Sequence, residues 1–221
     1  MNRAKPSPVV SEVEKVPRRK EYSLKLSDGT ELRVLEDHLS RFDLSPGKPL
    51  SDSLIRQIAF SYELATARDA ALRLLRVRPR TEMELRRRLR SKGFSADVAA
   101  ILLDEFKAGG VVDDRVFAQL WIKEKKARGD SGRRLIYKHL AAKGIEPSIL
   151  EEELRGNYDH DEEIDIASRL ARGRMNRMKH LPQAKVRQRL VGYLLRRGFD
   201  SDTAVQAVES ALAGHDKGEL V

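Results

Sequence analysis

The pattern that most constrains this chain recurs three times, around Gly93, Gly144 and Gly198, which are 51 and 54 residues apart. Large aliphatic residues stand four and eight positions before each glycine, a cation stands one position before it, and apolar residues stand one and ten positions after it. Residues four apart share one face of an α-helix, and a glycine in the left-handed conformation commonly ends a helix. Six matching offsets in three copies predict three tandem helical repeats.

Each repeat is predicted to contain three helices. The expected helices are 67–77, 82–92 and 96–108 in repeat 1, a helix from Asp113-Asp114 to about 127 followed by 132–143 and 147–155 in repeat 2, and helices that begin near Asp161, Pro182 and Asp200-Ser201 in repeat 3. Thr81 and Glu84 have capping-box spacing at the start of the second helix. Because one repeat cannot bury its own apolar face, neighbouring repeats must cover it. The sequence predicts a mainly α-helical, elongated and curved solenoid-like array.

A different pattern precedes the repeats. Residues Tyr22–Leu26 and Glu31–Leu35 alternate between apolar and polar, and the turn between them contains Gly29. A three-residue loop would pair Leu24 with Leu32 and place the apolar residues on one face of a β-hairpin. An isolated hairpin is marginal in water, so we expect this one to pack on a helix.

The predicted domain boundaries follow from these patterns. Residues 1–20, which mix prolines with scattered charges, should form a disordered basic tail. A helix should begin at Ser51, a second should be capped by Thr66, and Pro79 should end it near Val77. The segments are residues 1–20 as the tail, 21–65 as the hairpin and helix, 66–110 as repeat 1, 111–160 as repeat 2, and 161–221 as repeat 3 with a short tail.

The composition narrows the class of partner and compartment. The net charge is +9, of which residues 66–110 carry +5, so a polyanion or an acidic protein surface is the expected partner. There is no cysteine, which excludes disulfides and thiolate chemistry. The longest apolar run, Val98–Leu103, is far short of the ~20 residues of a membrane-spanning helix. We therefore expect a cytoplasmic monomer with no membrane partner.

Cations from all three repeats form the predicted interaction surface, which we call the basic track. Nine cations lie between Arg73 and Lys92 against two acids, an excess that is local and unbalanced. The track comprises Arg76, Arg78, Arg80, Arg86, Arg87, Arg90, Lys92, Lys123, Lys126, Arg128, Arg133, Arg134, Lys138, Arg172, Arg174, Arg177, Lys185 and Arg189. Two interpretations remain open: contact with phosphates or acidic protein, or a solvated face whose aliphatic stems cover the core.

Other candidate sites have ordinary structural explanations. The pair Asp113-Asp114 suits a helix start better than a metal or an acid–base site. Phe117, Trp121 and Tyr137 could stack on bases, but at helical spacing beside aliphatic residues they are more typical of a core. The five histidines are scattered without ligand spacing, and no nucleophile elbow or acidic two-metal cluster occurs. We expect no enzymatic activity, no metal and no cofactor.

The order of these motifs resembles the RecX family of regulators of the RecA recombinase. The resemblance covers residues 66–213. It depends on Arg78-Pro79-Arg80-Thr81 with Glu84-Leu85, Lys92-Gly93-Phe94, Asp113-Asp114 with Phe117-Ala118 and Trp121, Gly132-Arg133 with Ile136, Leu140 and Lys143-Gly144, and Arg197-Gly198-Phe199.

The resemblance implies a fold and a partner. It implies three three-helix repeats that lie in the groove of the RecA–single-stranded-DNA filament and that inhibit recombinase, ATPase and coprotease activities. Contact with single-stranded DNA would be direct or made within the filament. The alternative is a DNA- or RNA-binding helical repeat protein with no RecA partner.

Overall fold

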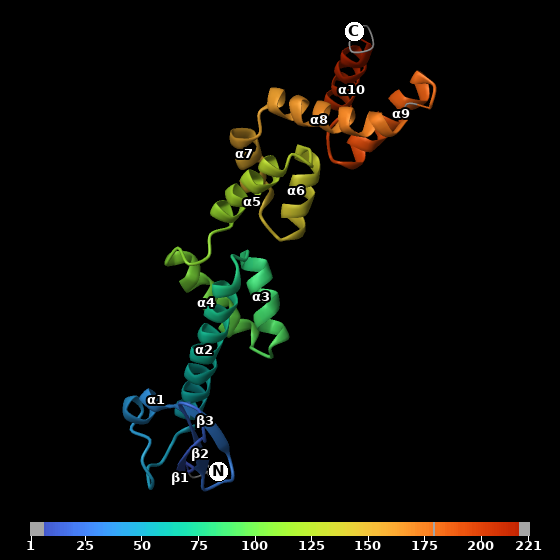
Figure 1. The fold of residues 1–221 in the computed structure, drawn as a ribbon. Coiled ribbons are helices and arrows are strands. Elements are labelled where there is room, and N and C mark those ends of the chain that lie inside the picture. Colours follow the sequence, from blue (N-terminus) through green and yellow to red (C-terminus); the bar gives the residue numbers. More distant parts are fainter. Residues whose placement is uncertain (1–6, 179, 217–221) are drawn as a thin grey trace, which may run out of the picture. The chain divides into compact units, whose positions relative to one another are not determined.

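The computed structural model describes residues 7–178 and 180–216, which divide into two compact units. The first unit comprises the chain up to Arg78 together with Leu85–Gly109. The second comprises Pro79–Glu84 and the chain from Gly110 onward. Each unit is described separately below, and Figure 1 labels the elements of both.

The first unit begins with a three-stranded antiparallel sheet in the order β1 (Val10–Lys15), β2 (Glu21–Leu26), β3 (Glu31–Leu35). The register of β2 and β3 sets Leu24 opposite Leu32, as the alternation predicts. Gly29 has φ +85°, the left-handed conformation that the hairpin loop requires.

Strand β1 corrects the prediction of a disordered tail over residues 1–20. Val10 is buried, and its N–H donates to the Lys48 carbonyl at 2.9 Å. The alternation of Val10 and Val13 with polar residues fits a half-buried strand, and it lengthens a hairpin that would be marginal alone. Residues 1–6, and the end of the predicted C-terminal tail at residues 217–221, lie outside the described residues.

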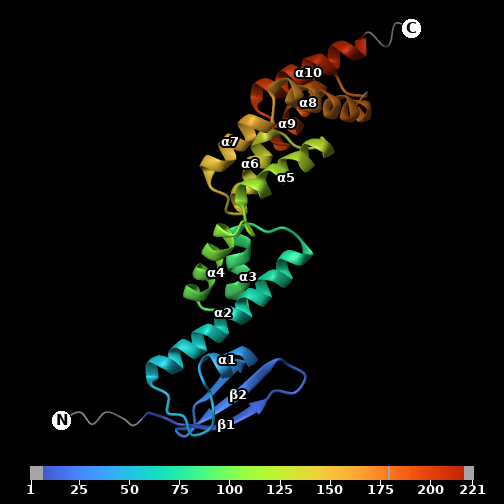
Figure 2. The ribbon, with the colours of Figure 1, turned by 90° about the vertical axis from the view of Figure 1, so that its left-hand side faces the viewer.

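Two helices accompany the sheet: α1 (Glu36–Arg41) and α2 (Asp52–Val77), which Figure 2 shows leaving the sheet and continuing beside α4. Ser51 caps α2 by accepting the N–H of Leu54 at 3.3 Å. Contrary to prediction, Thr66 caps no helix. Its hydroxyl donates to carbonyls of its own helix, since no glycine or proline interrupts α2. The predicted boundary at 65–66 therefore falls inside one continuous helix.

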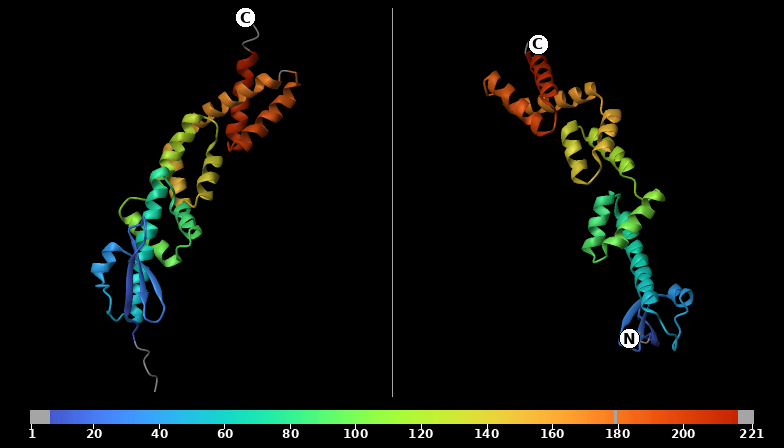
Figure 3. Two further views of the ribbon diagram at one scale, coloured as in Figure 1. Left: turned by 60° about the horizontal axis from the view of Figure 1, so that its bottom comes forward. Right: turned by 180° about the vertical axis from the view of Figure 1, so that it is seen from behind.

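The remaining elements are helices. They are α3 (Glu82–Ser91), α4 (Ala96–Ala108), α5 (Asp114–Arg128), α6 (Arg133–Ala142), α7 (Pro147–Asn157), α8 (His160–Met175), the short 3-10 helix η1 (Asn176–Met178), α9 (Gln183–Arg196) and α10 (Ser201–Asp216). Figure 3 shows α8, α9 and α10 in orange to red, with α10 packed against α8 and α9. The mainly helical fold with a small N-terminal sheet is confirmed.

The three glycines that define the repeat pattern have the same conformation. Gly93, Gly144 and Gly198 have φ values of +92°, +84° and +87°. In each case the next residue donates its N–H to the carbonyl of the leucine five positions before it, at 3.2 to 3.4 Å. This is the Schellman arrangement that ends a helix at a left-handed glycine. The aliphatic residues four and eight positions before each glycine are fully buried: Leu85, Leu89, Ile136, Leu140, Leu190 and Leu194.

The aromatic residues of repeat 2 belong to the core of the second unit. Phe117 is 9% exposed and stacks on Trp121, with ring centroids 6.0 Å apart. Trp121 and Tyr137 pack as partly buried residues against the same cluster. This placement favours the core interpretation over base stacking.

Candidate functional site

Two turns hold the second unit together, and the first lies at Gly144. The buried hydroxyl of Thr81 donates to the Lys143 carbonyl at 2.7 Å and accepts the N–H of Glu84 at 3.2 Å. The Lys143 ammonium lies 2.6 Å from a Glu84 carboxylate oxygen and 4.8 Å from the centre of the Trp121 ring. Thr81 therefore caps α3, as predicted, and also attaches the start of that helix to the turn of repeat 2.

The second turn, at Gly198, receives the start of α6 in an equivalent way. The N–H of Gly132 donates to the Arg197 carbonyl at 2.8 Å, and the N–H of Arg134 donates to the Gly198 carbonyl at 3.0 Å. The Arg197 guanidinium donates to the Asp130 carbonyl at 2.9 Å. In repeats 2 and 3 the cation before the glycine thus anchors the preceding segment, which the repeat pattern alone did not reveal.

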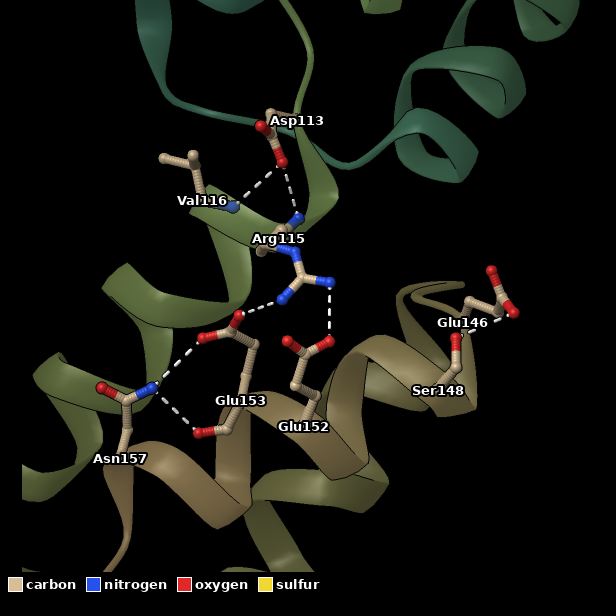
Figure 4. A network of polar contacts seen from close by, with 8 residues as sticks. All are labelled: Asp113, Arg115, Val116, Glu146, Ser148, Glu152, Glu153 and Asn157. Atoms are coloured by element: carbon tan, nitrogen blue, oxygen red, sulfur yellow. Dashed lines mark hydrogen bonds and ion pairs between the residues drawn. The ribbon is translucent and has the colours of Figure 1, made fainter.

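The paired acids at the start of repeat 2 cap helices. Asp113 accepts the N–H groups of Arg115 and Val116 at 2.8 and 3.1 Å, so it is the N-cap of α5 (Figure 4). Asp114 accepts the N–H of Glu82 at 2.9 Å and thereby satisfies the first turn of α3. The capping interpretation is confirmed for Asp113, whereas Asp114 caps a different helix from the one it begins.

Arg115 joins α5 to α7, a role that the sequence analysis missed. Its guanidinium lies 2.8 Å from carboxylate oxygens of both Glu152 and Glu153 (Figure 4). Glu153 is buried and also accepts the side-chain amide of Asn157 at 3.1 Å. The fork of Arg115 lowers the pKa of the Glu152 carboxyl. This cation serves the structure and is not available as a binding group.

Glu163 fixes the start of α6, whose N-cap residue Gly132 has no side chain to accept a hydrogen bond. A Glu163 oxygen accepts the N–H of Arg133 at 2.7 Å. Burial raises the pKa of the Glu163 carboxyl, and the nearby Asp200 carboxylate raises it further. The folded protein therefore holds a proton on Glu163 at pH values where the unfolded chain has lost it.

This raised pKa predicts a specific pH dependence. As pH falls from neutral toward the ordinary value of 4.5, the parent protein should gain stability relative to Glu163→Gln, because protonation removes the cost of burying the charge and glutamine cannot titrate. Melting temperatures of both proteins across this range measure the difference. A constant difference at every pH would contradict the assignment.

The residues of the basic track lie mostly in solvent. The exposed members are Arg76, Arg78, Arg86, Arg87, Arg90, Lys92, Lys123, Arg128, Arg134, Lys138, Arg172, Arg174, Arg177, Lys185 and Arg189, and the half-buried members are Arg80, Lys126 and Arg133. On α3, Arg86, Arg87 and Arg90 are exposed while Leu85 and Leu89 are buried, so the helix presents its cations outward.

Several cations of repeat 2 already have acidic partners. Lys126 lies 2.5 Å from a Glu162 oxygen and donates to the Asn157 carbonyl at 2.6 Å. Arg128 pairs with Glu124 on the same helix at 2.5 Å. These contacts reduce the positive charge that repeat 2 can offer to a polyanion.

Repeat 3 gathers its arginines differently. Arg174, Arg177 and Arg189 of the basic track line one cleft of about 550 Å³, which we call the arginine cleft. Arg196, which the sequence analysis did not select, completes it, together with Gln188, Gly192 and Met178. Arg172 and Lys185 are exposed but do not line this cleft.

Metal and membrane sites were also considered. Within residues 7–178 and 180–216, no group of three or more His, Cys, Asp or Glu side chains is placed to hold a metal ion. In that same part of the chain, no helix has the length and apolar character needed to cross a membrane.

Comparison with known proteins identifies the family. Models of the RecX first, second and third three-helix domains match residues 67–106, 113–154 and 161–208. This chain belongs to the RecX family. The regulatory protein RecX of Mycobacterium avium is 38% identical over 149 residues, which cover 66% of this chain and 85% of the relative. The suspected resemblance is confirmed.

Solved structures agree on the fold. A crystal structure of a regulatory protein RecX superposes with a TM-score of 0.73 at 23% identity, covering 92% of this chain and 99% of that one. RecX from Lactobacillus salivarius gives a TM-score of 0.65 at 22% identity, covering 68% of this chain and 97% of that one. The family is thus named for regulation, and its three-helix domains are those of this chain.

Proposed function

We propose that this RecX-family chain is a non-enzymatic regulator that binds in the groove of the RecA–single-stranded-DNA filament and inhibits the recombinase, ATPase and coprotease activities of RecA. Family membership supports the RecA partner. The exposed cations of α3 and of the arginine cleft support contact with phosphates or with acidic protein surface. Several weak contacts along one filament would add to a high avidity.

The observation that carries the proposal is the match of all three RecX domains to a chain whose basic residues face solvent. A protein bound in the groove would obstruct strand entry and the rearrangement of RecA protomers. The basic track would then contact the filament at more than one repeat.

Retention on RecA-coated and on bare single-stranded DNA distinguishes the two candidate functions. Stronger retention on RecA-coated DNA at moderate salt is the expected result. Equal retention on both, with a steep dependence on salt, would instead indicate a general nucleic-acid-binding protein.

The α3 cations provide the mutational test. Replacing Arg86, Arg87 and Arg90 with alanine should weaken retention on RecA-coated DNA about tenfold or more and lower the salt slope by roughly 2 to 3, because up to three phosphate contacts are lost. The far-ultraviolet circular dichroism should not change, since all three side chains are exposed.

A matched control removes the same charge elsewhere. Lys20, Arg33 and Arg56 are exposed and lie outside the basic track, so their triple alanine variant should retain near-parental binding. Equal losses in the two triple variants would show that net charge alone matters. Loss of helical signal in the α3 variant would show that its cations serve the fold.

A further inference from the structure

We propose that the arginine cleft is a binding site for closely spaced phosphate groups, and that it holds consecutive backbone phosphates of single-stranded nucleic acid without the help of RecA. The inference deepens the proposed function, because it rests on the same contact with a polyanion. It assigns that contact to one place in repeat 3 and makes it direct.

Three short elements bring the arginines together. Arg174 comes from the last turn of α8, Arg177 from η1, and Arg189 and Arg196 from α9, where seven residues, close to two helical turns, separate them. The return of the chain between α8 and α9 places side chains from both helices around one cleft of about 550 Å³. Four guanidiniums therefore border a single volume.

The cleft carries uncompensated charge. None of its lining residues is acidic, and among the described residues none of these four arginines has an ion-pair partner. By contrast, Lys126 and Arg128 of repeat 2 are both paired with glutamates. Four like charges around one volume repel one another, and a bound anion would relieve that repulsion.

A purely structural role accounts for only one of the four arginines. The Arg174 guanidinium lies over the Tyr193 ring at 4.8 Å from its centre, which fixes that side chain. Arg177, Arg189 and Arg196 are exposed and make no such contact among the described residues. Gly192, in the interior of α9, leaves the cleft wall without a side chain, at a helix position where alanine would be more stable.

The chemistry of the lining selects phosphate. The planar fork of arginine binds two oxygens of one phosphate at once, and several forks suit several phosphates. The cleft volume is many times the ~30 Å³ that one water occupies, so it is large enough for more than a single small anion. No aromatic ring lines the cleft, so it offers no stacking surface for bases. Binding should therefore follow the backbone and be independent of sequence.

The test uses the full-length chain and a fluorescent oligo(dT) strand without RecA, with binding followed by anisotropy at two salt concentrations. Arg177→Ala with Arg189→Ala should raise the dissociation constant about tenfold or more and reduce the salt slope by roughly 2. The control pair, Arg172→Ala with Lys185→Ala, removes the same charge from the same repeat outside the cleft and should change binding less than about threefold. Equal losses in the two pairs would overturn the site.

A second variant guards against a folding defect. Arg177→Lys with Arg189→Lys keeps the charge but removes the forks, so its affinity should fall between those of the parent and the alanine pair. Parental affinity in this variant would overturn the claim that guanidinium geometry matters. Circular dichroism of every variant should match that of the parent.

Competitors identify the source of the phosphate. Inorganic triphosphate should displace the oligonucleotide only at much higher concentration, and polyglutamate of equal charge should not displace it. Binding of triphosphate with no binding of oligo(dT) would overturn the nucleic-acid assignment, and displacement by polyglutamate would overturn the phosphate assignment.

RecA assays separate this inference from the proposed function. A parent protein that inhibits RecA but does not bind bare oligo(dT) would overturn the inference alone. One that binds oligo(dT) through the cleft but leaves RecA unaffected would overturn the proposed function alone.

Discussion

Replacing Gly198 with alanine is expected to destabilise the protein by roughly 3 kcal/mol, the sum of left-handed strain and overpacking. Gly198 has φ +87°, and a Cβ atom there would lie 2.8 Å from the Cα of Leu135 and closer still to its nitrogen and Cβ. The obstacle includes the backbone of α6, which cannot rotate away. A loss of this size should lower the melting temperature by roughly 6–12 °C in a chain of this length.

The other two glycines of the pattern provide a graded control. Gly93 has nearly the same φ, but nothing lies within 4 Å of its Cβ position, so alanine there should cost only about 1 kcal/mol of strain. At Gly144 the obstacle is the Met83 side chain, whose far end is flexible, so alanine should have an intermediate effect. Circular dichroism melts of the three variants give the order. Equal losses at Gly93 and Gly198 would show that only the helix ends matter and that the turns bind no neighbour.

Replacing Thr81 with valine should have the second largest effect, a loss of about 2 kcal/mol. Valine has the same shape but no hydroxyl, so the Lys143 carbonyl and the N–H of Glu84 would lose their partner in a site where Thr81 is fully buried. An unsatisfied buried polar group costs more than an average hydrogen bond contributes.

Thr66 gives a matched control for this change. Its hydroxyl donates to the carbonyls of Tyr62 and Glu63, which belong to the same helix. Valine at this position should change stability by less than about 0.5 kcal/mol, since a β-branched residue replaces another and the hydroxyl supports no cap. Similar losses in the two valine variants would contradict the assignment of Thr81 to the attachment of α3.

The repeat pattern predicts the helix ends well because the signal is local. A left-handed glycine and the buried leucine four positions before it belong to the same helical turn, so their spacing specifies the geometry. The spacing does not show what lies against the turn. The cation before each glycine was the available signal, but Lys143 and Arg197 were first interpreted by charge alone, whereas both anchor a preceding segment.

Residues of one type illustrate the same limit. Thr66 and Thr81 both preceded an expected helix, yet only Thr81 follows a proline that ends the helix before it. In the tail, Val10 and Val13 carried the alternation of a strand, but its partner is fixed by long-range pairing with β2. The arginine cleft also depends on the packing of α8 beside α9, so the helical spacing of Arg189 and Arg196 could indicate only half of it.

The ATPase activity of RecA on single-stranded DNA, with increasing amounts of this protein, tests the central claim most directly. A progressive fall in ATPase activity at micromolar protein and moderate salt, weakened in the Arg86, Arg87 and Arg90 alanine variant, is the expected result. Unchanged ATPase and strand exchange at the same concentrations would contradict the assignment of this chain as an inhibitor of the RecA filament.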